Sequence, residues 1–264
     1  MLRFQCFPLL YHGICSNTPE HPLAQVNANM VQIKERLLRK AYHNLYFGFE
    51  ADYQKLGDVA FVKETSETFA LPRGYAGSSN FGLGLGVLYD GRHNILNVRK
   101  GFFSELAFLQ YHTGLGSEYT FSTITTDVRV YRPVNRRDVL AAQLFGQFNT
   151  GDTPFNQLAL LGGETIMRGY YLGRYRDNNQ LTTQVEYRFL PLPLGFTKRW
   201  GAAVFASTGS VFTSFKTFSL NDFLWAGGGG IRFLLFPKKD IFTRLDVAFT
   251  HEGTGVYIFI GEAF

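Results

Sequence analysis

Long apolar runs are absent from this sequence of 264 residues. No stretch of about 18 or more apolar residues occurs, which excludes a helical membrane protein, and the mean hydropathy is −0.06. Cysteine is nearly absent as well, because Cys6 and Cys15 are the only two. They are too few for a zinc site of the usual spacing, and they leave open whether a disulfide forms in an oxidising compartment.

Enzyme signatures are missing too. The sequence has no Gly-x-Ser-x-Gly elbow and no His-Glu-x-x-His, and its six histidines are dispersed. Gly82, Gly84 and Gly86 lie within an alternating strand with no helix after it, whereas a phosphate loop needs a strand, a turn and a helix. Small residues that make room or permit a kink explain them better. We expect no enzymatic activity, no metal and no cofactor.

Charge gives no sign of a nucleic-acid partner. The 26 basic residues exceed the 21 acidic ones, for a net charge of +5, but they are scattered among strands and loops. Nucleic-acid binding would need them clustered on a recognition fold. Solvated loops and a polar interior are the simpler interpretation.

The sequence does contain repeated alternation of apolar and polar residues. In the stretch 181–189, Thr182, Gln184, Glu186 and Arg188 share one face and apolar residues dominate the other, as on the two sides of a strand. Segments of about 10 residues with one apolar face are typical of a transmembrane barrel, whereas soluble sandwich strands have about 5–6 residues. Aromatic residues make up 16%, which suits membrane-interface girdles. We predict an all-β, transmembrane, antiparallel up-and-down β-barrel.

Eleven candidate strands can be placed along the chain: 43–53, 57–66, 79–90, 101–113, 119–132, 137–149, 180–190, 199–213, 224–236, 241–250 and 255–264. Since bacterial single-chain barrels usually have an even number of strands, we expect 10–12, with residues 3–11 or 30–40 as the candidate for a twelfth. Residues 41–264 then form the barrel, and residues 1–40 form a poorly patterned N-terminal segment. Within that segment, 31–40 reads as a short helix or a strand edge.

The most informative stretch is 162–189, GGETIMRGYYLGRYRDNNQLTTQVEYRF. Its Met-Arg-Gly-Tyr core and Gly-Arg-Tyr-Arg-Asp tail come directly before a strand with a polar inner face. The stretch resembles the long inserted loop and next strand of the BamA/TamA-like outer-membrane barrel family, also called the bacterial surface antigen family. The resemblance extends to the C-terminus and reaches back, more weakly, to about Asn80.

The resemblance implies a loop, 162–179, locked inside the barrel lumen. In the family the arginine of this motif, here Arg168, contacts acidic residues of the inner wall, and Glu186 stands at the matching position of the next strand. A following Phe-x-Asp-x-Gly pattern reads Phe205-Ala206-Ser207-Thr208-Gly209 here. Glu186 and Ser207 are then the expected barrel-wall partners of the loop, and because Ser207 replaces that carboxylate, we expect the lock to depend mainly on Glu186. The other loop residues implied by the resemblance are Gly163, Gly169, Tyr170, Gly173, Arg174 and Asp177.

The last segment resembles the C-terminal targeting signal of outer-membrane barrels. Phe264 supplies the terminal aromatic residue, and Val256, Ile258 and Ile260 supply outward apolar residues at alternate positions. Glu262 departs from the pattern, since an apolar residue is expected there. The resemblance implies that the assembly machinery of the outer membrane reads this segment during biogenesis.

By resemblance, the function is protein assembly or translocation at the outer membrane of a Gram-negative bacterium. The implied partners are outer-membrane lipid, the barrel assembly machinery and client outer-membrane proteins. Two alternatives stay open, a passive structural or plugged-pore protein and a soluble lipocalin-like carrier. Residues 1–32 lack a secretory signal, so the chain is mature or truncated, or its start codon is misplaced. We expect the first strands of the family's barrel to be missing from it.

Overall fold

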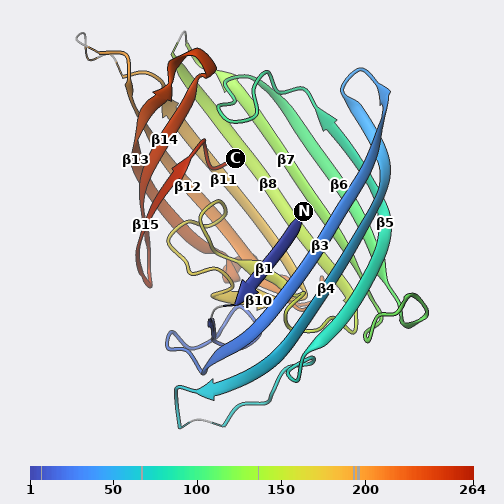
Figure 1. Ribbon diagram of the computed structural model, residues 1–264. Coiled ribbons are helices and arrows are strands. Elements are labelled where there is room, and N and C mark those ends of the chain that lie inside the picture. Colours follow the sequence, from blue (N-terminus) through green and yellow to red (C-terminus); the bar gives the residue numbers. More distant parts are fainter. Residues whose placement is uncertain (7, 67, 136, 193, 195–196) are drawn as a thin grey trace.

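The computed structural model describes residues 1–6, 8–66, 68–135, 137–192, 194 and 197–264, and its regular secondary structure is almost entirely β-strand (Figure 1). Thirteen strands form one antiparallel sheet: β1 (Leu2–Cys6), β2 (Leu9–Tyr11), β3 (Ala24–Tyr42), β4 (Leu45–Lys63), β5 (Ser78–Asp90), β6 (Gly101–Tyr111), β7 (Phe121–Pro133), β8 (Asp138–Gly151), β11 (Asn179–Phe189), β12 (Trp200–Phe212), β13 (Leu224–Phe236), β14 (Ile241–Thr250) and β15 (Gly253–Ile260). A second, two-stranded sheet pairs β9 (Ala159–Leu161) with β10 (Tyr175–Asp177).

The only helices among the described residues are three single 3₁₀ turns, Thr113–Leu115, Leu220–Asp222 and Pro237–Lys239. Within the same residues, no helix has the length and apolar character needed to cross a bilayer. The all-β antiparallel meander predicted from the sequence is confirmed.

The large sheet curves around a lumen (Figure 1). From β3 to β8 each strand pairs with the next in sequence, and β11 to β15 continue the order beyond β8. β1 and β15 are the two ends of this path, and no pairing joins them among the described residues. The outer edges of β1 and β15 are therefore unpaired, and we call the place where the strand order is interrupted between them the seam.

Strand alternation separates a polar interior from an apolar exterior. On β11, Gln184, Glu186 and Arg188 are buried toward the lumen, whereas Val185 between them is exposed. On β15, the outward side chains of Val256, Ile258 and Ile260 are 63%, 68% and 63% exposed. Large apolar side chains remain exposed on all the long strands from β3 to β15, which is typical of a lipid-facing band.

The predicted strand map needs three corrections. Segments 43–53 and 57–66 are one strand, β4, because residues 54–56 between them pair with Met30–Gln32 of β3. The irregularity beside them is a bulge at Gly57-Asp58 opposite Asn27–Asn29, where Asp58 has φ +53°. Residues 31–40 are part of β3 and not a short helix, which agrees with 30–40 as a strand candidate, and β1 and β2 lie within the candidate 3–11, so the sheet begins before residue 41. The last strand ends at Ile260, since Gly261 turns away from it with φ +91°.

The meander gives the barrel two rims. We call the rim at which β3, β5, β7, β11, β13 and β15 end the C-terminal rim; it is the upper one in Figure 1. We call the opposite rim, from which the segment between β8 and β11 starts, the loop rim. That segment turns back into the lumen and builds the candidate site.

Candidate functional site: a loop fastened inside the lumen

The segment between β8 and β11 folds against the inner wall of the sheet (Figure 1). Its base is the β9–β10 pair, in which Leu161 lies opposite Tyr175. Leu161, Met167, Tyr170 and Tyr175 form a buried cluster with Val211 of β12 and Ala226 of β13. Apolar side chains on both sides of the Gly162-Gly163 turn thus pack the loop against the wall. The polar side chains of the loop then determine its exact position.

The turns of the loop depend on glycine. Gly162 and Gly169 both have φ +110°, a conformation that costs other residues roughly 1–3 kcal/mol. A Cβ at Gly162 would lie 2.2 Å from the Tyr171 carbonyl oxygen, and one at Gly169 would lie 2.5 Å from Cγ2 of Thr250. The Gly169 amide donates to the Tyr257 hydroxyl at 2.9 Å. The loop tip is therefore pressed against β14 and β15.

Replacing Gly162 with alanine should release the loop, because the new Cβ meets a fixed carbonyl oxygen as well as an unfavourable φ. We expect trypsin to cut after Arg168, Arg174 or Arg176 at least about tenfold faster in folded protein, which corresponds to about 1.4 kcal/mol. Gly116→Ala is the matched control, since Gly116 also has positive φ, +91°, but open space around its Cβ position. Equal protection of Gly162→Ala and wild type would contradict the tight turn.

Arg168 is the central polar group of the loop. Its Nη2 donates to Oε2 of Glu186 and its Nη1 to Oδ2 of Asp246, both at 2.6 Å. The guanidinium stacks on the Phe205 ring, with Cζ 3.4 Å from the ring centroid. A planar guanidinium suits two carboxylates and an aromatic face at once, which an ammonium group does not. Arg168 therefore joins β11, β12 and β14 through one side chain.

The two carboxylates belong to a larger buried cluster. Glu186 also accepts from Arg188 Nε at 2.7 Å and Arg232 Nη2 at 3.3 Å, while Asp246 also accepts from Arg244 Nη1 at 2.6 Å and is ion-paired with Arg232. Glu262 completes the group through Arg232 Nη2 at 3.1 Å. All of these side chains are at most 2% exposed. Isolation from water makes each unpaired charge expensive, so the members hold one another in place.

The structure brings Arg168 and Glu186 together as the sequence predicts, but the role expected for Ser207 is wrong. The Ser207 hydroxyl donates to the Ala226 carbonyl at 3.5 Å and does not contact Arg168. On β12, the residue that contacts the Arg168 guanidinium is Phe205, through its ring. The second carboxylate comes from Asp246 of β14. A signal for Asp246 was present: it follows Arg244 by two residues on an alternating strand, as Arg188 follows Glu186.

Glycines on β13 make space for this cluster. A Cβ at Gly228 would lie 2.7 Å from the Phe205 ring, and one at Gly230 would lie 2.2 Å from a carboxylate oxygen of Asp246. On the far wall, Gly82 and Gly86 similarly make room for the Tyr111 ring and the Glu50 carboxylate. The interpretation of the strand glycines as space-making residues thus fits the geometry.

The base of the loop has its own polar contacts near the loop rim. Arg174 bridges to Glu252 at 2.5 Å and donates to the Thr18 hydroxyl at 2.7 Å, while the Tyr175 hydroxyl donates to Glu252 at 2.7 Å. Asp177 accepts from the Thr213 hydroxyl at 3.0 Å. These contacts tie the loop to the β14–β15 turn, to the β12–β13 connection and to the N-terminal segment.

Three further motif residues shape the same region. Gly163 and Gly173 have φ +124° and +73°, and their amides donate to Tyr170 and Leu161 carbonyls at 3.1 and 3.2 Å. The Tyr170 hydroxyl lies 2.9 Å from His251 Nδ1 and donates to the Trp225 carbonyl at 3.2 Å. Burial raises the pKa of Tyr170 to about 12, so the hydroxyl stays protonated as a donor.

The C-terminal tail departs from its expected position. Val256, Ile258 and Ile260 face outward as predicted, but Phe264 is not in phase with them. After Gly261 the tail bends into the lumen, where Phe264 is buried beside Tyr131 and its carbonyl accepts from Arg188 Nη2 at 3.1 Å. The alternation was extended four residues too far because it gave no sign of the turn at Gly261.

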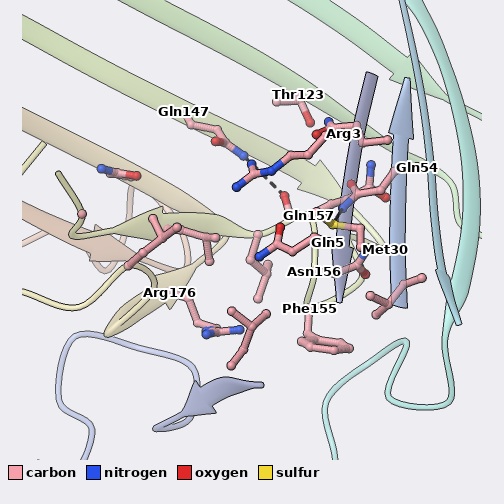
Figure 2. A pocket seen from close by; sticks show the side chains of 18 of the residues that line it. Arg3, Gln5, Met30, Gln54, Thr123, Gln147, Phe155, Asn156, Gln157 and Arg176 are labelled. Carbon is pink, nitrogen blue, oxygen red and sulfur yellow. Dashed lines mark hydrogen bonds between the residues drawn. The ribbon is translucent and has the colours of Figure 1, made fainter. Parts of the chain in front are cut away.

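The lumen keeps a cavity of about 470 Å³ between the loop and the β3–β8 wall. Its lining mixes apolar, amide and charged side chains, and Figure 2 shows the amides of Gln54, Gln147 and Gln157 together with Arg3 and Arg176. Gln147 Nε2 donates to the Gln157 carbonyl at 3.3 Å. Within the described residues, no group of three or more His, Cys, Asp or Glu side chains is placed to hold a metal.

The sequence and the fold are similar to those of known proteins. Residues 22–235 match the family model of the Omp85 superfamily domain. Among solved structures, the chain is similar to BamA from Haemophilus ducreyi lacking POTRA domains 1–3, at a TM-score of 0.62 and 15% identity. The match covers 90% of this chain and 54% of that one. A search of curated protein sequences found no match. The resemblance to BamA/TamA-like barrels and the transmembrane antiparallel barrel fold are both confirmed.

Proposed function

The chain belongs to the Omp85 superfamily, and from this premise we propose that it assembles or translocates proteins at the bacterial outer membrane. The observation that carries the proposal is that the lumen loop docks on the β14–β15 hairpin, whose outer strand is a free edge of the sheet. Gly169 contacts Tyr257 of β15, Arg168 contacts Asp246 of β14, and Arg174 contacts Glu252 between them.

An unpaired strand edge is a place where another chain can add a strand by backbone hydrogen bonding. β15 pairs with β14 on one side only. Its outward side chains, Val256, Ile258 and Ile260, lie in the apolar band, so an added strand would continue the lipid-facing surface. The loop braces the hairpin from the lumen and keeps this edge in a defined position while a client strand pairs with it.

Site-specific photocrosslinking tests the assembly function. We expect a photoreactive residue at Ile258 of β15 to crosslink a folding-arrested outer-membrane barrel protein at least about tenfold more than the same residue at Leu144 of β8. Both side chains face outward, but β8 is paired on both sides, with β7 and β11. Equal or absent crosslinking at the two positions would contradict assembly at the β15 edge.

A passive plugged pore is the second candidate, favoured by the way the loop occupies the lumen. The two functions differ in what the loop does. Deletion of 163–172 should increase ion conductance through a plugged pore, while client crosslinking at Ile258 is expected only of an assembly factor. We propose no catalytic activity and no cofactor for either function, with lipid, the barrel assembly machinery and client proteins as partners.

A further inference from the structure

The two rims of the barrel carry opposite charge. Nine basic side chains are exposed at the C-terminal rim: Arg39, Lys40, Lys100, Arg132, Arg137, Lys198, Arg199, Lys238 and Lys239. At the loop rim the exposed charged side chains are mostly acidic, with Glu20, Glu64, Glu118, Asp152 and Asp222 against Lys63, Arg73 and Lys216. The excess of +5 in the whole chain is thus concentrated at one end.

The cations of the C-terminal rim have no acidic partners in the part of the chain that the structure describes. The acidic side chains of this rim outside the lumen are already bonded: Asp90 to Arg92, Asp240 to Arg99, and Asp138 to Asn135 and Tyr187. None of the nine basic side chains forms an ion pair among the described residues. A ring of like charge without counter-charges is unfavourable unless anions lie beside it.

The ring lies where a bilayer interface would be. Exposed aromatic side chains, Phe47, Tyr89, Phe102 and Trp200, stand on the outer face of the strands just inside this rim. Such aromatic girdles mark the level of the lipid headgroups. Arg39 lies opposite Phe47, Lys100 precedes Phe102 by two residues, and Arg199 precedes Trp200 by one. These basic side chains therefore lie at or just beyond the level of the aromatic side chains.

The arrangement of the ring favours lipid over a protein partner. Its members come from five separate strand connections, those after β3, β5, β7, β11 and β13, or from the strand ends beside them. A docked protein would contact one continuous patch, whereas lipids surround a barrel on all sides. We propose that the C-terminal rim binds the phosphate headgroups of anionic phospholipids and so selects them around the barrel.

This inference rests on the membrane embedding of the proposed function. Protein is refolded into phosphatidylcholine bilayers, and a shift between unboiled and boiled samples on SDS gels first verifies the folded barrel. Spin-labelled phosphatidylglycerol and phosphatidylcholine then report which lipid associates with the protein. Since each cation near an anionic surface changes binding by up to about fivefold, we expect a several-fold preference for phosphatidylglycerol that declines in high salt.

Two triple variants that remove the same net charge at different rims test whether the position of the cations decides the lipid preference. Arg132→Gln, Arg199→Gln and Lys239→Gln together should reduce the preference at least about twofold. Lys63→Gln, Arg73→Gln and Lys216→Gln at the loop rim should leave it unchanged. A folded barrel without preference, or equal loss in both triples, would overturn the inference and leave the proposed function standing. Failure to fold in any bilayer would instead contradict the membrane embedding.

Discussion

Replacing Arg168 with alanine is expected to free the lumen loop without destabilising the barrel. Replacing Glu186 with glutamine is expected to destabilise the barrel while the loop stays in place. Arg168 is the only cluster residue that belongs to the loop, and it has two carboxylate partners at 2.6 Å. If Glu186 is neutralised, Asp246 still holds the loop. If Arg168 is removed, the loop loses both carboxylate contacts, and the cluster keeps only the hydrogen bond from Arg244 Nη2 to the Glu164 carbonyl at 3.0 Å.

The charge balance of the cluster explains the opposite effect on the barrel. Four guanidinium groups, of Arg168, Arg188, Arg232 and Arg244, face three carboxylates, of Glu186, Asp246 and Glu262. Removal of Arg168 makes the buried charges equal. Removal of a carboxylate leaves two excess positive charges, and breaking a buried pair from one side costs about 3–5 kcal/mol.

Two measurements on the same variants test this division. Trypsin cleavage within 168–176 reports the loop, and thermal or urea unfolding in detergent reports the barrel. Arg168→Ala should expose the loop at unchanged barrel stability, Glu186→Gln and Asp246→Asn singly should lower stability while the loop stays protected, and the double neutralisation should expose the loop. A double-mutant cycle of Arg168→Ala with Glu186→Gln then isolates the pair energy. Loop exposure in Glu186→Gln alone would show that Asp246 does not hold Arg168.

Strand periodicity made most of the inner wall predictable. An alternating strand has only two faces, so the inward direction of Glu186, Arg188, Arg244 and Asp246 followed from sequence. Which of these groups meets Arg168 depends on the stagger between strands, and no single strand carries that information. The Ser207 prediction failed for this reason, since a motif position was transferred where the neighbouring strand supplies the carboxylate.

Breaks in the periodicity were harder to predict, because bulges and turns use the same residues. The predicted break at 54–56 lies beside Gly57-Asp58, which has the composition of a hairpin turn, yet β3 pairs with β4 on both sides of that dipeptide, which forms a bulge. Gly261 was taken as a strand residue although its positive φ ends β15. In both places a single residue with positive φ, Asp58 or Gly261, determines the path of the strand. Whether the strand continues after it depends on the neighbouring strands and not on the local sequence.

The tail beyond Gly261 is expected to stabilise the same cluster from the C-terminal rim. Glu262 accepts from Arg232, and the Phe264 carbonyl accepts from Arg188, whose Nε donates to Glu186. Neither tail residue contacts the loop, so an effect of the tail on the loop must pass through these arginines. We expect Glu262→Gln to lower barrel stability by about 1.5–3 kcal/mol in urea unfolding while the loop stays protected from trypsin, because Arg168 keeps both Glu186 and Asp246.

Phe264 should act in two separable ways, through packing inside the lumen and through the targeting role that its resemblance implies. Phe264→Ala removes a buried ring and should cost about 3–5 kcal/mol of barrel stability in detergent. Phe264→Leu keeps an apolar side chain against Tyr131 and should cost less than about 1.5 kcal/mol, while it removes the aromatic group that a targeting signal presents. Outer-membrane yield in cells should therefore fall in both variants, but refolding in vitro only in Phe264→Ala. If Phe264→Leu reaches the membrane as well as wild type, the residue serves packing alone, and its burial in the lumen accounts for its presence.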